Sequence, residues 1–165
     1  MPDLNLLDFL SADHERLLEA GPPTVLDVSQ HLSVERDFLY SAVNEHVADG
    51  ETIVDGLRRA ERRLEERLRD FERQATPEHR EKLQAEIGDH VTGQEELFAR
   101  FREQIPESAL VIPSEVIALS VGGAPTHAHP ILAHGGLIGE LIEDVASAAD
   151  HVRDHLHHDK DAETG

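Results

Sequence analysis

The stretch "VSQHLSVERDFLYSAV" (residues 28–43) carries a histidine and a carboxylate on an otherwise apolar helical face. Val28, His31, Glu35, Phe38 and Ala42 recur at alternating steps of three and four, which places all five on one side of an α-helix. Burying an unpaired charge is costly, or it shifts the pKa of the group until that group is neutral. His31 and Glu35 therefore need partners on other elements.

Three other segments have a helical apolar stripe that polar residues interrupt. The interrupting residues are His14 in the first segment, Glu61 in the third, and His90 and Gln94 in the fourth. Since each occupies a position that the stripe turns toward the core, six polar residues in all are predicted to be buried.

The spacing of these residues from the turns predicts that five of them lie at one level. In an antiparallel pair of helices, two residues at the same level are equally far in sequence from the connecting turn. The midpoint between His14 and His31 falls in "GPPT", that between Glu35 and Glu61 in "ADG", and that between Glu61 and His90 in "ATPE". Each of these stretches is also a predicted turn. The five residues are therefore expected to form one layer.

A layer of three imidazoles and two carboxylates is typical of a metal site. His31 and Glu35, at positions i and i+4, project from one face of a helix toward the same point. The chain contains no cysteine, so a metal would be held by nitrogen and oxygen ligands, which suit iron, manganese or zinc. The alternative from the same residues is a ring of buried His–Glu hydrogen bonds that holds no metal.

Turn signals divide the chain into helices. Breaks at "GPPT", "HVADGET" and "ATPEH" separate four helical patterns within residues 1–107, and the short connections favour antiparallel neighbours. The low aromatic content, 4%, also favours helix packing over a sheet sandwich. The predicted fold is all-α, an up-down-up-down four-helix bundle. Residues 108–165 are a predicted C-terminal tail, with a short helix at 114–120 and an amphipathic helix at about 137–156.

The charge of the chain limits its partners. The formal net charge is −19, which opposes binding to nucleic acid and to anionic membranes. The sequence shows neither a signal peptide nor an apolar run of the roughly 20 residues that span a bilayer. The expected location is cytoplasmic, and the expected assembly is a monomer or a homodimer.

Seven of the twelve histidines lie in the tail, and they offer a second place for metal. They are His127, His129, His134, His151, His155, His157 and His158. Loose binding of nickel, copper or zinc is one interpretation of this pattern, and a solvated polar tail is the other. Only His151 and His155 have the spacing of ligands on one helical turn.

The stretches "LLDFLSADHERLL", "HLSVERDFLYSAVNEHVADGE" and "HVTGQEELFARFRE" resemble hemerythrin-like proteins with an HHE cation-binding domain, particularly those of the actinobacterial type. The resemblance covers residues 4–104, and "PTHAHP" (125–130) is loosely similar to a stretch in the tails of these proteins. It implies a non-haem di-iron centre in a four-helix bundle, with dioxygen or iron as the species handled. By motif, His14, His31, Glu35 and His90 match ligands of the family.

Two ligand positions depart from the family pattern. Leu57 or Glu61 stands where the third helix would supply a histidine, and Gln94 stands where the fourth helix would supply a carboxylate. Glu95 follows directly, but about 100° further round the helix. The resemblance therefore implies a degenerate site for one or two iron ions.

The sequence favours cation binding over catalysis. It shows no nucleophile with its base and no phosphate-binding loop. The predicted function is binding of non-haem iron by a hemerythrin-like protein, in oxygen or iron sensing or handling. The alternative is a metal-free acidic bundle that serves as an interaction or stress-related scaffold.

Overall fold

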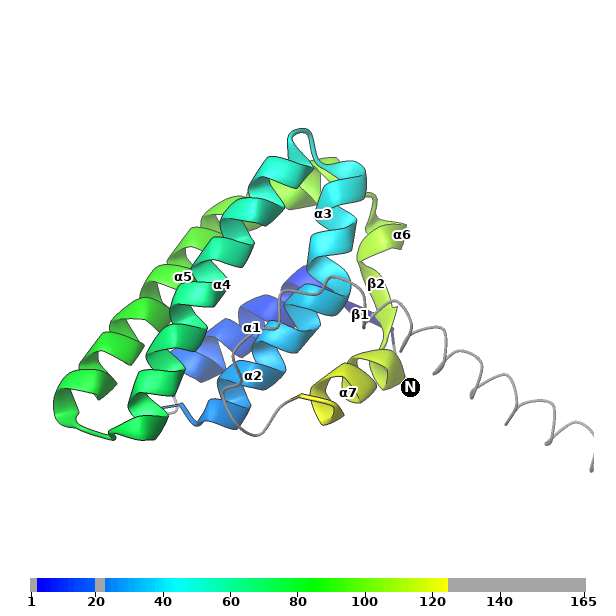
Figure 1. Cartoon of the computed structure of the whole chain (residues 1–165). Coiled ribbons are helices and arrows are strands. Elements are labelled where there is room, and N and C mark those ends of the chain that lie inside the picture. The colour runs from blue at the N-terminus through cyan, green and yellow to red at the C-terminus, as the bar shows by residue number, and fades with distance from the viewer. Residues whose placement is uncertain (1–2, 20–22, 125–165) are drawn as a thin grey trace, which may run out of the picture. The chain divides into compact units, whose positions relative to one another are not determined.

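The computed structural model describes residues 3–19 and 23–124, and the described residues are almost entirely helical (Figure 1). The prediction of an all-α fold is confirmed. The elements are β1 (Asp3–Asn5), α1 (Leu6–Glu19), α2 (Val25–Val34), the π-helical turn η1 (Glu35–Leu39), α3 (Tyr40–His46), α4 (Gly50–Arg73), α5 (Pro77–Gln104), α6 (Glu107–Leu110), β2 (Val111–Pro113) and α7 (Ser114–Gly122).

Two of the helices begin at residues whose side chains cap the helix N-terminus. The hydroxyl of Thr24 accepts a hydrogen bond from the backbone N–H of Asp27, and the Asp27 carboxylate accepts one from the backbone N–H of Thr24. This reciprocal capping box starts α2. Thr76 caps α5, and Pro77 occupies a first-turn position that needs no N–H. Before α4, Asp49 has a φ of 60°, a left-handed conformation that aspartate tolerates.

The buried polar residues separate two apolar clusters. The first cluster contains Leu10, Leu57 and Phe98 among others, and the second contains Leu17, Leu64 and Ile87. Along α1 the chain passes from the first cluster through His14 to the second, since Leu10 precedes His14 and Leu17 follows it. The polar residues thus lie between two water-excluding layers.

The order in which the other helices meet these clusters gives their directions. The continuous helix α2–η1–α3 runs from the second cluster to the first, α4 runs from the first to the second, and α5 runs back to the first. Neighbouring helices therefore run in opposite directions, and Figure 1 shows α4 and α5 side by side. In this arrangement the polar residues of the four helices meet at one level in the centre of the core.

Residues after α5 return to the N-terminal part of the chain. β2 pairs antiparallel with β1, and α7 packs on α2. The Ser120 hydroxyl donates a hydrogen bond to Asp37 Oδ2 over 2.6 Å. The helix predicted at 114–120 is confirmed by α7. These elements belong to one compact unit together with the helices that precede them.

Two other predictions concern residues that the structure does not describe. The tail helix at 137–156 and the seven tail histidines lie outside the described residues. Among the helices that are described, none combines the length and the apolar character required to cross a membrane.

Candidate metal centre

The six polar residues predicted to face the core are all buried. Their exposed fractions lie between 0 and 5%, for His14, His31, Glu35, Glu61, His90 and Gln94. Four of them form a compact group. His14, His31, Glu35 and His90 each offer one potential ligand atom, and these four atoms lie within 4.8 Å of one another.

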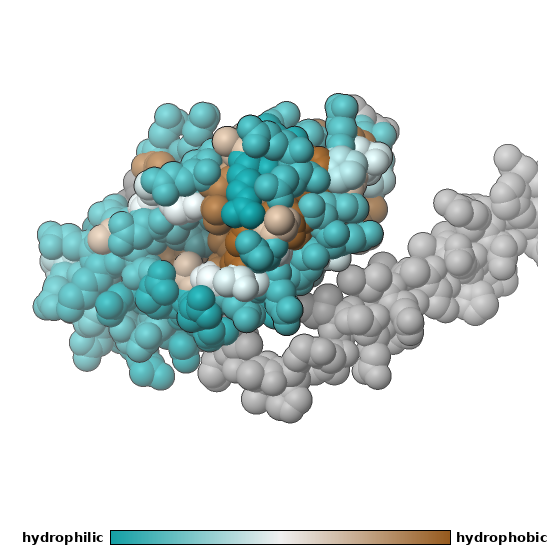
Figure 2. Space-filling model, turned by 90° about the horizontal axis from the view of Figure 1, so that it is seen from above, coloured by the Kyte–Doolittle hydropathy of each residue, from teal (hydrophilic) through white to brown (hydrophobic). Residues whose placement is uncertain are grey.

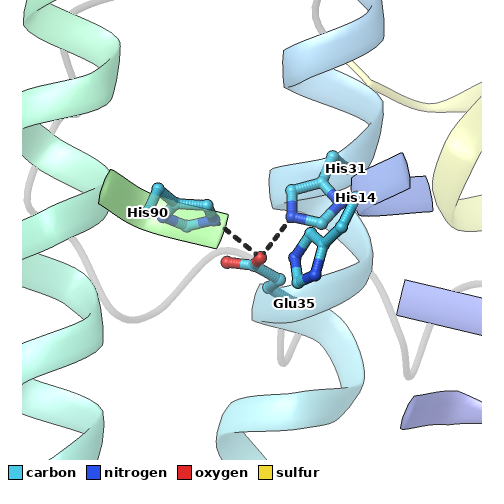
Figure 3. Close-up of side chains that lie close together, drawn as sticks. All are labelled: His14, His31, Glu35 and His90. Carbon is cyan, nitrogen blue, oxygen red and sulfur yellow. Dashed lines mark hydrogen bonds and ion pairs between the residues drawn. The ribbon is translucent and has the colours of Figure 1, made fainter. Parts of the chain in front are cut away.

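The three imidazoles surround the carboxylate of Glu35 (Figure 3). Glu35 Oε1 lies 2.5 Å from His31 Nε2 and 3.0 Å from His90 Nε2. The ring of His14, from α1, lies beside that of His31, with 4.8 Å between the ring centroids. One carboxylate oxygen is therefore shared by histidines from two different helices, and a third imidazole lies at the same level.

Several nitrogens of this group have no hydrogen-bond partner among the described residues. They are His14 Nε2, His31 Nε2 and His90 Nδ1. His31 Nε2 nevertheless forms an ion pair with Glu35 Oε1, whereas His14 Nε2 and His90 Nδ1 have neither a hydrogen bond nor an ion pair among the described residues. Buried polar atoms in native proteins are almost always partnered. Unpartnered imidazole nitrogens around a carboxylate are the donor set that binds a transition metal.

Two more carboxylates form hydrogen bonds with the Nδ1 atoms of two of these histidines. Asp13 Oδ2 lies 2.9 Å from His31 Nδ1, and Glu95 Oε1 lies 2.6 Å from His14 Nδ1. When Nδ1 donates to a carboxylate, the lone pair of the neutral ring is on Nε2, which faces Glu35 in His31. Carboxylates placed in this way orient metal-binding histidines and raise their basicity.

The charges of the group are strongly coupled. Burial alone would lower the pKa of His31, but the carboxylates of Glu35 and Asp13 outweigh it and raise that pKa to about 9. Burial would raise the pKa of Glu35, yet His90 and His31 hold it well below its usual range. Burial and the charge on His31 lower the pKa of His14. The metal-free group thus holds Glu35 ionised, His31 protonated and His14 neutral near pH 7.

Glu61 is buried but belongs to a second, adjacent polar cluster. Its carboxylate accepts a hydrogen bond from the guanidinium of Arg36, which also pairs with Glu65. The Tyr40 hydroxyl donates to Glu61 Oε2 over 2.8 Å and lies 3.5 Å from Glu35 Oε2. The structure therefore does not place Glu61 among the four clustered ligands. Tyr40 stands between it and Glu35.

The π-helical turn η1 explains how Tyr40 reaches this position. The backbone N–H of Tyr40 bonds to the carbonyl of Glu35, five residues earlier. In an α-helix two such residues would be about 140° apart around the axis, whereas a π turn brings them nearly onto one face. The extra residue of the π turn also places Leu39 in the core. Phe38, which the apolar stripe predicted to be buried, is only partly buried.

Gln94 is the sixth buried polar residue, one turn after His90 on α5. Neither atom of its side-chain amide has a hydrogen-bond partner among the described residues. An amide oxygen is a neutral ligand, and a buried amide without partners is costly. Gln94 can therefore supply a further oxygen on the helical face that carries His90.

Sequence reasoning missed Asp13, Arg36 and Tyr40, and it placed Glu95 too far round the helix to contribute. Glu95 bonds to the outer nitrogen of His14 instead of substituting for Gln94. Asp13 bonds to His31 on the next helix, so its position beside His14 in the sequence did not indicate this contact. The π turn leaves no comparable sequence signal, so neither Tyr40 nor the pairing of Arg36 could have been found in that way.

Comparisons with known proteins add no assignment to this geometry. No protein-family model matches the chain, and no significant match was found among curated proteins or among solved structures.

Proposed function

We propose that this protein binds a transition-metal cation through His14, His31, Glu35 and His90. The observation that carries the proposal is that four potential ligand atoms lie within 4.8 Å of one another, on buried side chains. Three of the imidazole nitrogens there have no hydrogen bond among the described residues, and one of these, His31 Nε2, has only its ion pair with Glu35. A cation would satisfy those nitrogens and would offset the buried carboxylate of Glu35.

The donor set restricts the kind of cation. Three imidazoles and one carboxylate favour iron, manganese or zinc over magnesium and calcium, which prefer oxygen ligands. Affinity alone does not select iron from these metals. We propose iron because the sequence resembles hemerythrin-like proteins, whose cation is non-haem iron, and we propose dioxygen as the small molecule handled on the same ground.

The surroundings favour one ion per chain over two. A second ion needs further anionic ligands, but the Glu61 carboxylate is engaged by Arg36 and Tyr40, and Gln94 is neutral. The guanidinium of Arg36 already places a positive charge beside Glu61, where a second ion would have to bind. Leu57, the other residue at the third-helix position, is part of the apolar core.

Metal analysis tests the proposal directly. The full chain is purified without a metal-affinity step, stripped with chelator, and titrated separately with Fe²⁺ under anaerobic conditions, Mn²⁺ and Zn²⁺. We expect saturation at one ion per chain and a rise in melting temperature, because a ligand that binds only the folded form stabilises it. The Fe²⁺ form is then mixed with dioxygen, and its near-ultraviolet spectrum is recorded.

Matched variants separate the cluster from the other histidines. His31→Ala and Glu35→Gln should each abolish saturable binding, whereas His46→Ala, which alters a histidine outside the cluster, should not.

The double variant His151→Asn/His155→Asn tests binding by the tail. Gln94→Glu combined with Leu57→His should raise the stoichiometry toward two. Absence of binding for all three metals would favour the metal-free scaffold, and two ions in the unaltered chain would refute the single-ion proposal.

A further inference from the structure

A pocket of about 330 Å³ lies beside the candidate metal centre, within the unit that contains α1, α2 and α7. Its walls are mostly apolar and include Phe9 from α1, Val34 from α2, and Ile117 and Val121 from α7. A volume of this size and an apolar lining with a few polar groups are typical of sites for small molecules.

The pocket has few polar groups, and they differ in whether they already have a hydrogen-bond partner. Ser114, at the start of α7, has a buried hydroxyl with no hydrogen-bond partner among the described residues. Asp13 and Arg16 also line the pocket, but they bond to each other, with 2.7 Å between Arg16 Nε and Asp13 Oδ1. Gln30 also lines the pocket with a side-chain amide, but it is not among the buried groups without a partner. The hydroxyl of Ser114 is therefore the pocket group that gains most from a hydrogen bond with a ligand.

The charges near the pocket oppose an anionic ligand. Arg16 also bonds to Asp27 Oδ1, so two carboxylates face one guanidinium. The chain as a whole has a formal charge of −19, and the face shown in Figure 2 is predominantly hydrophilic. An anion would lose its hydration without gaining an unpaired cation, whereas an uncharged ligand would not bear that cost.

One side chain connects the pocket with the candidate metal centre. Asp13 lines the pocket, and its Oδ2 atom accepts the hydrogen bond from His31 Nδ1. Its Oδ1 atom holds Arg16 on the pocket side. A molecule that shifts Asp13 or Arg16 would change the orientation of the His31 ring, and the orientation of a ligand histidine affects metal affinity.

We propose that this pocket binds a small uncharged molecule with an apolar body and one hydroxyl or carbonyl group directed at Ser114. Binding there alters the cation affinity of the four-residue cluster through Asp13. The first statement is independent of the proposed function, and the second rests on it.

Fluorescence of the neutral probe N-phenyl-1-naphthylamine tests the pocket in the full chain. Three competitors with one skeleton then define the ligand class: cyclohexylmethanol, cyclohexanecarboxylate and cyclohexylmethylamine. We expect saturable probe binding, with displacement by the alcohol at a concentration roughly tenfold or more below that needed for the carboxylate. Ser114→Ala should weaken the binding of the alcohol about fivefold, because one hydrogen bond between the protein and the alcohol is lost.

Two variants on α7 distinguish the pocket from a general apolar surface. Ala118 lines the pocket but is itself exposed, so Ala118→Phe should block the pocket without disturbing the core. Leu119 is 64% exposed and does not line the pocket, so Leu119→Ser serves as the matched control. Probe binding that survives Ala118→Phe, or that is lost in Leu119→Ser, would overturn the pocket assignment, as would absence of binding or preference for the carboxylate.

Cation titration with and without saturating cyclohexylmethanol tests the link. We expect the Kd for Zn²⁺ to change about fivefold or more, and we expect Asp13→Asn to remove that change when each chain is saturated with cyclohexylmethanol at its own measured affinity. An unchanged Kd in the original chain would refute the link and leave the pocket standing. If no cation binds at all, the proposed function and the link both fail, and the probe experiments still decide the pocket.

Discussion

Two polar clusters lie in the core of this protein, and their central carboxylates have different kinds of partner. Around Glu35, three imidazole nitrogens have no hydrogen bond among the described residues, although His31 Nε2 is ion-paired with the Glu35 carboxylate. Around Glu61, the carboxylate is met by the Arg36 guanidinium and the Tyr40 hydroxyl. Both clusters lie at one level of the same core, so burial alone does not explain the difference.

The difference lies in the source of positive charge. In the Glu61 cluster the chain supplies its own cation, Arg36, on a side chain that reaches from η1 and is 27% exposed. In the Glu35 cluster the groups that surround the carboxylate are histidines, which bind protons or metals depending on conditions. A closed ion-pair network and an incomplete donor set therefore lie next to each other in one core, on either side of Tyr40.

The largest expected effect comes from removing the built-in cation. Arg36→Met leaves the carboxylates of Glu61 and Glu65 without their guanidinium, and breaking a buried pair in this way costs about 3 kcal/mol of unfolding free energy. Urea denaturation of the metal-free chain measures the loss. Arg63→Met, which breaks an exposed pair with Glu86, should cost less than about 1 kcal/mol. Equal losses in the two variants would show that Arg36 has no special role.

The second effect is a pH dependence that belongs to the incomplete cluster. The pKa of His31 is about 9 in the folded chain and about 6.5 when unfolded, so its contribution to stability is complete below pH 6.5. That contribution is lost as the pH rises through 9. The metal-free chain should lose up to about 3 kcal/mol over this interval. Chemical denaturation at pH 6 and pH 9.5 measures the change.

Metal should reverse this dependence, because a metal ligand histidine must be deprotonated. The Zn²⁺-loaded chain is expected to gain stability from pH 6 to pH 8 while the metal-free chain loses it. A metal-free stability that is flat between pH 6.5 and 9, in a chain that unfolds cooperatively, would contradict the charge assignment for His31.

The third prediction compares one residue from each cluster under metal. His31→Ala should remove the stabilisation that Zn²⁺ gives the original chain, which is about 2.7 kcal/mol at a free concentration of one hundred times Kd. Glu61→Gln should retain it, since Glu61 lies outside the four-residue group. Differential scanning calorimetry with and without Zn²⁺ provides the measurement. Loss of the metal effect in Glu61→Gln would place Glu61 in the cation site.

The fourth prediction concerns the carboxylates behind the histidines. Glu95→Gln should lower the affinity for Zn²⁺ about tenfold, because Glu95 fixes the ring of His14 through Nδ1. Its side chain is 40% exposed, which favours the lower end of the range for such groups. Glu96→Gln makes the same charge change at an exposed position on α5 and should leave the affinity unchanged. Competition with a chromophoric chelator measures both.

The sequence predicted the position of the polar layer but not its division into two clusters. The helix periodicity and turn midpoints identify which residues face the core, since both depend only on 3.6 residues per turn. Those signals correctly predicted that His14, His31 and Glu35 would be buried at one level. They carry no information on where a long side chain from the surface, such as Arg36, will turn inward.

The π turn is the other feature that periodicity could not reveal. The extra residue in the π turn at Glu35 rotates the residues that follow it, whereas the predicted stripe from Glu35 to Phe38 assumes a regular α-helix. Leu39 and Tyr40 are buried in place of Phe38 for that reason. The error is local, because Ala42, the next residue of the predicted stripe, is buried.

The smallest expected effect tests whether the two clusters are independent, and Tyr40→Phe is the variant that does so. Tyr40 is 3% exposed, and its hydroxyl donates to Glu61 while lying 3.5 Å from Glu35. Losing one hydrogen bond of this kind should cost about 1 kcal/mol. The double variant Tyr40→Phe/Glu61→Gln completes a thermodynamic cycle, and a coupling of about 1 kcal/mol between the two changes would assign the loss to that bond. The Kd for Zn²⁺ should stay within about threefold of the original, because the longer contact with Glu35 contributes little to its orientation. A larger change in Kd would mean that Tyr40 positions Glu35, in which case the two clusters are one unit and the contrast between them does not hold.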